Sequence, residues 1–224
     1  MNIEILETPE GLARAAAELF VQRNPSAVAL SGGSTPKLLY QLLADPNEPF
    51  RDQVPWSRIQ FFWSDERHVP PDHPDSNYRL ANEAMLAHVP ITRGNVHRVM
   101  SENPDAEEAA ERYEAIVPPR FALILLGLGN DGHTASIFPG SAVLHETERL
   151  VAAPWVEKLN TYRITMTLPL INNAASVLFL VSGAEKAEIV REILKGPERY
   201  PAQEVKPAEG ELIWLLDRAA ASKL

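Results

Sequence analysis

The sequence predicts an α/β fold in which helices cover both faces of a parallel sheet, and two observations support this. Four short apolar runs each lead into a polar turn, at residues 27–30, 59–63, 121–126 and 176–181. Segments with helical periodicity lie between them, and nearly continuous apolar strands are typical of parallel sheets buried on both faces. We therefore expect a three-layer α/β/α sandwich, built as a single domain over residues 1–224.

The first helix is expected to begin at Pro9. Thr8 is a favoured N-cap residue, and proline is favoured at the first helical position. The apolar side chains that follow recur on one helical face; they are Leu12, Ala15, Ala16, Leu19 and Phe20. The run at 27–30 then enters the turn Ser31–Thr35, which opens a second helix.

The middle and the end of the chain repeat this alternation of strand and helix. The run at 59–63 leads into Ser64–Arg67, and a proline-rich loop at 69–75 precedes a predicted helix and is a candidate cover for a site. Asn103 and Pro104 are expected to start another helix. Its inward residues are predicted to be Ala106, Ala109, Ala110 and Tyr113. The run at 176–181 leads into a last helix, which carries Ala187, Val190, Ile193 and Leu194.

Composition excludes several classes of function. The formal net charge of −9 and the isoelectric point near 5.2 argue against binding to a nucleic-acid backbone, which requires a basic surface. The chain contains no cysteine, so disulfides and thiolate metal sites are excluded. No apolar run approaches the length that spans a bilayer, and the N-terminus does not resemble a signal peptide. We expect a cytoplasmic protein without nucleic-acid or membrane partners, as a monomer or weak homo-oligomer.

The predicted sheet also indicates where a ligand binds. Ligands of open parallel sheets bind at the carboxyl ends of the strands. Four polar segments are expected to lie there; they are residues 31–35, 64–67, 127–140 and 182–186.

The loop GLGNDGHTASIFPG, residues 127–140, allows two interpretations. Its first six residues fit the G-x-G-x-x-G pattern of a dinucleotide-binding turn. That turn must open a long crossover helix, but Pro139 and Gly140 follow Gly132 by only seven and eight residues. The carboxylate of Asp131 would also repel a pyrophosphate, so we disfavour a dinucleotide cofactor.

The alternative assigns chemistry to Asp131 and His133. A histidine can take a proton from water and return it to a leaving group, and a nearby carboxylate can select its tautomer. An isolated Asp-Gly-His would more simply be a helix cap beside an exposed histidine. Other segments of the chain favour the catalytic interpretation of Asp131 and His133 over the structural one.

Five segments resemble the 6-phosphogluconolactonase family in order and spacing, and this family is related to the glucosamine-6-phosphate deaminases. They are SGGSTPKLLY (31–40), SDERHVPPDHPDSNYR (64–79), GLGNDGHTASIFPG (127–140), YRITMTLPLINNA (162–174) and VSGAEKAEIV (181–190). The resemblance covers essentially the whole chain. It implies the sandwich type of the phosphosugar isomerases and CoA-transferases, and hydrolysis of 6-phospho-D-glucono-1,5-lactone to 6-phosphogluconate in the oxidative pentose phosphate pathway.

The resemblance assigns the chemistry to His133 as general base on water, with Asp131 as its orienting partner. Asp65 matches a catalytic aspartate of the deaminases and would orient the water or substrate hydroxyls, whereas Glu66 is as readily structural. Backbone amides of the glycine loop are candidate oxyanion donors. The deaminases carry a glutamate where this chain has Phe138, and its absence favours the lactonase. A phosphosugar isomerase or deaminase and a non-catalytic phosphosugar sensor remain the alternatives.

The substrate phosphate is expected to bind at the Ser31–Thr35 turn and on three cationic side chains. Backbone amides at a helix N-terminus form a ready anion site, here contributed by Gly32, Gly33, Ser34 and Thr35. The resemblance implies that Arg67 and Lys186 hold the phosphate, and Arg163 is a weaker candidate because its segment also fits an alternating strand. We expect no cofactor, and no metal, because His68 and His73 lack a metal-binding spacing.

Overall fold

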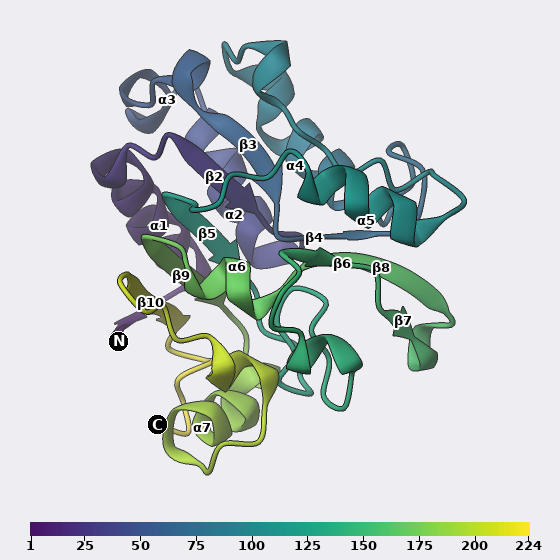
Figure 1. Cartoon of the computed structure of the whole chain (residues 1–224). Coiled ribbons are helices and arrows are strands. Elements are labelled where there is room, and N and C mark those ends of the chain that lie inside the picture. Colours follow the sequence, from purple (N-terminus) through teal and green to yellow (C-terminus); the bar gives the residue numbers. More distant parts are fainter.

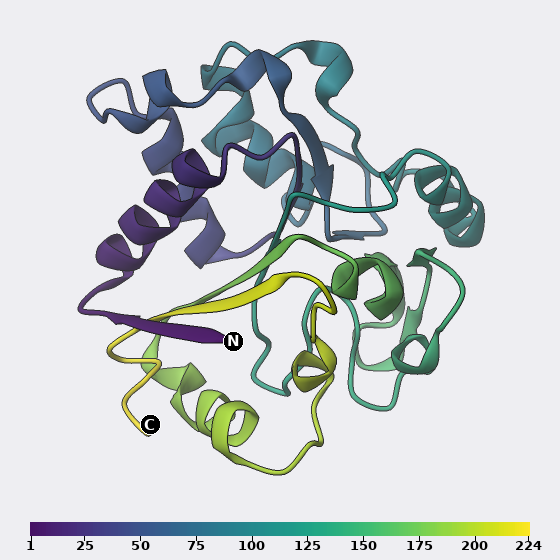
Figure 2. The same ribbon diagram turned by 60° about the vertical axis from the view of Figure 1, so that its left-hand side comes forward.

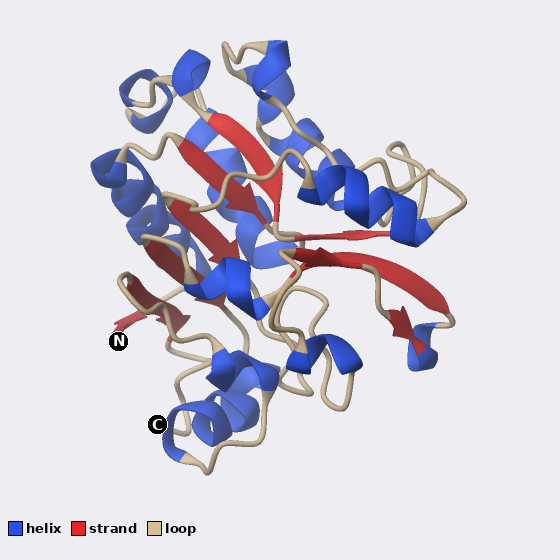
Figure 3. Ribbon diagram, in the orientation of Figure 1, coloured by secondary structure: helices blue, strands red, loops and turns tan.

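The computed structural model describes all 224 residues and has the predicted α/β architecture. A six-stranded sheet forms its centre, with every neighbouring pair of strands parallel (Figure 1, Figure 3). In their order across the sheet, the strands are β1 (Asn2–Leu6), β10 (Glu211–Asp217), β9 (Ser176–Val181), β5 (Leu123–Leu126), β2 (Ala27–Leu30) and β3 (Gln60–Trp63). The four predicted strands are present, and each begins within two residues of its expected start.

Helices cover both faces of this sheet, which confirms the three-layer sandwich. One face packs against α1 (Pro9–Arg23), α2 (Ser34–Ala44), α3 (Phe50–Gln53) and α4 (Asn77–Ala84). The other packs against α5 (Ala106–Glu114), α6 (Leu168–Asn172) and α7 (Ala187–Lys195). Alternate residues of one strand serve the two cores: Leu123 and Leu125 face the first, Ile124 and Leu126 the second.

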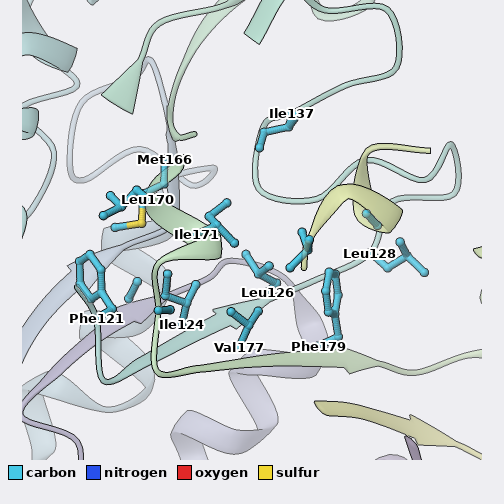
Figure 4. Packing of buried hydrophobic residues seen from close by; sticks show 14 of the residues in the cluster. Phe121, Ile124, Leu126, Leu128, Ile137, Met166, Leu170, Ile171, Val177 and Phe179 are labelled. Carbon is cyan, nitrogen blue, oxygen red and sulfur yellow. The ribbon is translucent and has the colours of Figure 1, made fainter. Parts of the chain in front are cut away.

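The second core is drawn from close by in Figure 4, which shows side chains of β5 and β9 against those of α6. Ile124, Leu126 and Val177 of the sheet lie beside Leu170 and Ile171, and all five are fully buried. These short strands therefore need no polar face, which is why their sequence reads as uninterrupted apolar runs.

A second, smaller sheet lies beside the main one, and the sequence indicated only one of its strands, the alternating segment that contains Arg163. Its antiparallel strands are β4 (Asp65–Arg67), β8 (Thr161–Met166) and β6 (Val151–Ala152), and β7 (Trp155–Val156) pairs with β8 (Figure 1). The segment Ser64–Arg67 was expected to be a loop, but Asp65–Arg67 is a strand. The reason is pairing with residues 163–165, about one hundred positions later in the sequence.

Two further details differ from the expectations. The edge strand β1 and its neighbour β10 were not predicted; they lie side by side at one end of the sheet (Figure 2). α5 starts at Ala106 and not at Asn103, because Asp105 is its N-cap and accepts hydrogen bonds from the amides of Glu107 and Glu108. Its four predicted inward residues are all buried. None of the helices has the length and apolar character required to traverse a bilayer.

The strand order positions a site. From β2 the chain moves to β3 on one side, and from β5 it moves to β9 and then β10 on the other. β2 and β5 are neighbours, so the direction of winding reverses between them. A crevice opens beyond the carboxyl ends of the strands at such a point.

Candidate active site

A cavity of about 500 Å³ lies beyond the carboxyl ends of β2, β3, β5 and β9. The catalytic and phosphate-binding residues expected from the sequence line it, except Asp131, which contacts Nδ1 of His133. The lining includes Gly32, Gly33, Ser34, Thr35, Asp65, Arg67, His133, Arg163 and Lys186. The fold thus brings together segments spread over about 150 positions of the chain, as the rule for parallel sheets predicts.

One wall of the cavity is the N-terminus of α2. Gly33 is the N-cap residue, and no side chain caps the helix. The first backbone bond into the helix runs from the amide of Lys37 to the carbonyl of Gly33, so the amides of Ser34 and Thr35 have no acceptor in the helix. Gly33 has φ of 109°, a conformation that glycine adopts without strain. This end of the cavity suits an anion.

A pair of guanidinium groups lies on the second wall. Arg67 and Arg163 are directly opposite each other in the pairing of β4 with β8. Burial, reinforced by the charge of Arg67, lowers the pKa of Arg163 from its usual value, although an arginine remains charged. Arg67 donates a hydrogen bond to the carbonyl of Asp75 in the proline-rich loop. Like charges opposite each other in a sheet destabilise it, and a bound anion would relieve that cost.

Lys186 reaches the cavity from the turn that follows β9. Its ammonium donates a hydrogen bond of 2.6 Å to Oδ1 of Asn130 in the glycine loop. The turn is held by the buried carboxylate of Asp217, at the end of β10, which accepts from the Ser182 hydroxyl at 2.6 Å and from the Gly183 amide at 3.1 Å. The position of Lys186 therefore depends on β10, a strand that was not predicted.

The glycine loop holds an aspartate and histidine pair. Nδ1 of His133 lies 2.5 Å from Oδ1 of Asp131, and Nε2 has no hydrogen-bond partner in the protein. No helix occurs between Gly127 and Gly140, which excludes the crossover helix that a dinucleotide turn requires. The amides of Gly129 and Gly132 donate to carbonyls of the same loop. They are not free to act as oxyanion donors, which corrects that expectation for these two groups.

The carboxylate of Asp131 carries a second contact that the sequence did not reveal. The ammonium of Lys158 forms an ion pair with Oδ2 of Asp131. Burial raises the pKa of Asp131, but hydrogen bonds from Lys158 and His133 outweigh it and hold that pKa well below its usual range. Asp131 is therefore ionised beside His133. An ionised acceptor on Nδ1 selects the tautomer whose Nε2 carries a lone pair toward the cavity.

Asp65 is buried at the floor of the cavity in a network of polar groups. Its Oδ2 accepts a hydrogen bond of 2.6 Å from the Ser136 hydroxyl, and its Oδ1 lies 3.1 Å from the Asn77 amide nitrogen. Asn77 also donates to the backbone carbonyl of Asp65 at 2.9 Å. Neither Ser136 nor Asn77 was predicted to contact Asp65. No pattern in the sequence around either residue indicates this contact, which depends on the tertiary fold.

Glu66 has a structural role, one of the two that the sequence allowed. Its carboxylate accepts hydrogen bonds of 2.7–2.8 Å from the amides of Arg67, Asn77 and Tyr78, and one of 3.0 Å from the Ser76 hydroxyl. It thereby joins β4 to the first turn of α4. The two site residues that flank it, Asp65 and Arg67, are held in place through this carboxylate.

The chain resembles known proteins over nearly its whole length. A family model described as glucosamine-6-phosphate isomerases/6-phosphogluconolactonase matches residues 5–214. The chain belongs to this family. A 6-phosphogluconolactonase of Synechocystis is 44% identical over 216 residues, which cover 91% of this chain and 86% of the relative. The solved structure of 6-phosphogluconolactonase from Trypanosoma brucei has a TM-score of 0.87 and 32% identity, covering 100% of this chain and 98% of that one.

The fold alone does not distinguish the two activities in the family name. A monomeric glucosamine-6-phosphate deaminase has a TM-score of 0.86 at 23% identity, over the full length of both chains. The discrimination must therefore come from residues of the site. Phe138, for which the resemblance implies a glutamate in the deaminases, is almost fully buried and packs on His133 with 4.2 Å between ring centroids.

Proposed function

We propose that this protein is a 6-phosphogluconolactonase, which hydrolyses 6-phospho-D-glucono-1,5-lactone to 6-phosphogluconate in the oxidative pentose phosphate pathway. The observation that carries the proposal is the pairing of His133 with an ionised Asp131 in a cavity whose other walls suit a phosphate. The close relatives of this chain bear the name of the same enzyme.

His133 acts as the general base in the proposed mechanism. Nε2 takes a proton from a water molecule as that water attacks C1 of the lactone, and Asp131 stabilises the imidazolium that forms. The tetrahedral intermediate collapses as the bond from C1 to the ring oxygen breaks, and the imidazolium returns its proton to that oxygen. The products are a carboxylic acid and a hydroxyl group. No covalent bond to the protein is required.

The phosphate is proposed to bind at the α2 N-terminus together with Arg67, Arg163 and Lys186. The unpaired amides of Ser34 and Thr35 supply neutral donors, and a guanidinium can hold two phosphate oxygens at once. Binding at this end would set C1 of the substrate against His133. Asp65, oriented by Ser136 and Asn77, is proposed to accept from a substrate hydroxyl.

The test is to generate the lactone with glucose-6-phosphate dehydrogenase and follow its decay with and without the protein. We expect His133→Ala to lower kcat by roughly 10²–10⁴, the usual loss for a general base, with a smaller change in KM. Accelerated decay that persists in His133→Ala would remove His133 from the mechanism. Release of ammonia from glucosamine-6-phosphate would instead assign the deaminase activity, and binding of 6-phosphogluconate without turnover would indicate a sensor.

Four other expectations stay predictions. They are the single-domain organisation over residues 1–224, the cytoplasmic location, the monomeric or weakly associating state, and catalysis without metal or cofactor. Size-exclusion chromatography coupled to light scattering would measure the association state directly.

A further inference from the structure

Lys158 contacts the catalytic pair from outside the glycine loop. It lies in a short 3₁₀ turn, Glu157–Leu159, between β7 and β8. Its ammonium pairs with Oδ2 of Asp131 and lies 4.4 Å from the centroid of the Phe138 ring. Phe138 in turn packs on His133. A single ammonium therefore contacts two of the residues that pack against the imidazole, Asp131 and Phe138.

The hairpin that carries Lys158 is well anchored, so this position does not depend on the lysine alone. Trp155 pairs with Tyr162 across β7 and β8, and their rings lie 4.9 Å apart. Asn160 closes the turn with φ of 48°, and its amide donates to the carbonyl of Glu157 at 3.0 Å. Asparagine tolerates this left-handed conformation better than most residues.

The two carboxylate oxygens of Asp131 have different partners: Oδ1 contacts Nδ1 of His133, and Oδ2 contacts the ammonium of Lys158. An unshared carboxylate beside Nδ1 favours the protonated imidazolium, which cannot act as a base. The ammonium on the other oxygen offsets that charge and disfavours a second cation next to it. With Lys158 present, the carboxylate holds the ring through Nδ1 while the ammonium balances part of the carboxylate charge.

Other charges also face His133 across the cavity. Those that line the same cavity are Asp65, Arg67, Arg163, Glu185 and Lys186. Of these, Asp65 is bound by Ser136 and Asn77, and Lys186 by Asn130. None of them forms a hydrogen bond or ion pair with the Asp131 carboxylate, which distinguishes Lys158 from the rest.

We propose that Lys158 is a positioning residue: its ammonium holds the Asp131 carboxylate against Nδ1 of His133 and opposes a positive charge on the imidazole, which must be neutral to act as a base. The proposal rests on the function proposed above for His133. It assigns to Lys158 no direct contact with the substrate.

The experiment compares Lys158→Met with Lys158→Arg. Methionine retains an apolar stem over Phe138 but removes the charge, whereas arginine retains the charge. Lys206→Met serves as the matched control, since Lys206 pairs with Glu198 at the surface and does not line the cavity. Each variant is measured in two ways: the pH dependence of kcat/KM for the phosphorylated lactone, and titration of the His133 imidazole by NMR in the free protein. The chain has six histidines, and His133→Ala assigns the resonance.

We expect Lys158→Met to move both the NMR titration midpoint and the acid limb of the rate profile upward by about 0.5–1 pH unit. A neighbouring like charge disfavours the charged form, and solvent weakens the effect at a half-exposed site. On the acid limb this corresponds to a roughly three- to tenfold loss of rate. Lys158→Arg and Lys206→Met should keep the wild-type midpoint.

Three results would overturn the proposal. One is an unmoved NMR midpoint in Lys158→Met. Another is a loss of rate equal at every pH, and the third is a rise in KM alone, which would place Lys158 on the substrate. A failure of the general-base proposal is distinguishable from these results. It would appear as full turnover in His133→Ala, independently of the NMR midpoints measured in the wild type and in the Lys158 variants.

Discussion

Gly32 lies against the side chain of Asn77, and a single methyl group there should perturb the site measurably. A Cβ added at Gly32 would lie 1.8 Å from Oδ1 and 2.5 Å from Cγ of Asn77. These separations are far below van der Waals contact, so the Asn77 side chain must move. Asn77 is buried, and its movement would break both hydrogen bonds to Asp65, at 2.9 Å and 3.1 Å.

The expected cost of Gly32→Ala follows from those two bonds. A neutral hydrogen bond contributes about 1 kcal/mol and one to a charged group about 1.5–3 kcal/mol, so their loss costs roughly 2–4 kcal/mol. The φ of Gly32 is not in the left-handed region, so alanine regains about 0.4–1 kcal/mol by restricting the unfolded chain. The free energy of unfolding should fall by about 1–3 kcal/mol, which corresponds to a Tm lower by roughly 3–10 °C.

The assay is urea unfolding together with kcat/KM for the phosphorylated lactone. Gly94→Ala is the control, because a Cβ at Gly94 meets nothing within 4 Å. In the background of Asn77→Ala the clash disappears, so Gly32→Ala should cost little there, and the two substitutions should be strongly non-additive. An equal penalty in both backgrounds, or wild-type stability and activity in Gly32→Ala alone, would refute the reasoning.

Three further predictions concern the anion site, the buried carboxylate and metals. Arg67→Ala and Lys186→Ala should raise KM and reduce the preference for the phosphorylated lactone over gluconolactone, with some loss of kcat; an unchanged preference in both would place the anion site at the α2 N-terminus alone. Glu66→Gln turns an NH₂ group toward donors such as the Tyr78 amide and should lower the free energy of unfolding by about 2–4 kcal/mol. Burial raises the pKa of Glu66, although its three amide donors oppose this shift. The contribution of Glu66 to the free energy of unfolding therefore declines as the pH rises from the pKa of the unfolded state to that of the folded state. Urea unfolding of Glu66→Gln at several pH values should lack this decline. Prolonged chelation should leave turnover intact, since no cluster of three metal-ligating side chains is present; loss of activity restored by a divalent ion would contradict this.

Much of the candidate site could be predicted because its residues follow strands that are recognisable locally. The Ser31–Thr35 turn follows an apolar strand and precedes a helix, and Asp131 and His133 are two positions apart in one loop. The rule that parallel strands end at a common edge then places these segments together without knowledge of the strand order.

Other members of the site depend on pairings that no local pattern encodes. Asp65 and Arg67 form a strand only because residues 163–165 pair with them, and Asn77 is marked by no motif of its own. The edge strand β1 and its neighbour β10 were missed as well. β10 carries Asp217, which holds the turn that presents Lys186.

The sequence by itself determined the class of fold, the core strands, the start of the first helix and the composition of the glycine loop. Each of these depends on residues close together in the chain, where hydrophobic period, capping and turn chemistry act. Only the tertiary structure decided that Lys158 and His133 both contact the Asp131 carboxylate. Lys158 lies 27 positions from Asp131, and their contact exists because β7 and β8 form a hairpin whose turn reaches the glycine loop. Such a contact is a property of strand pairing and register, and these are determined by packing across the whole molecule.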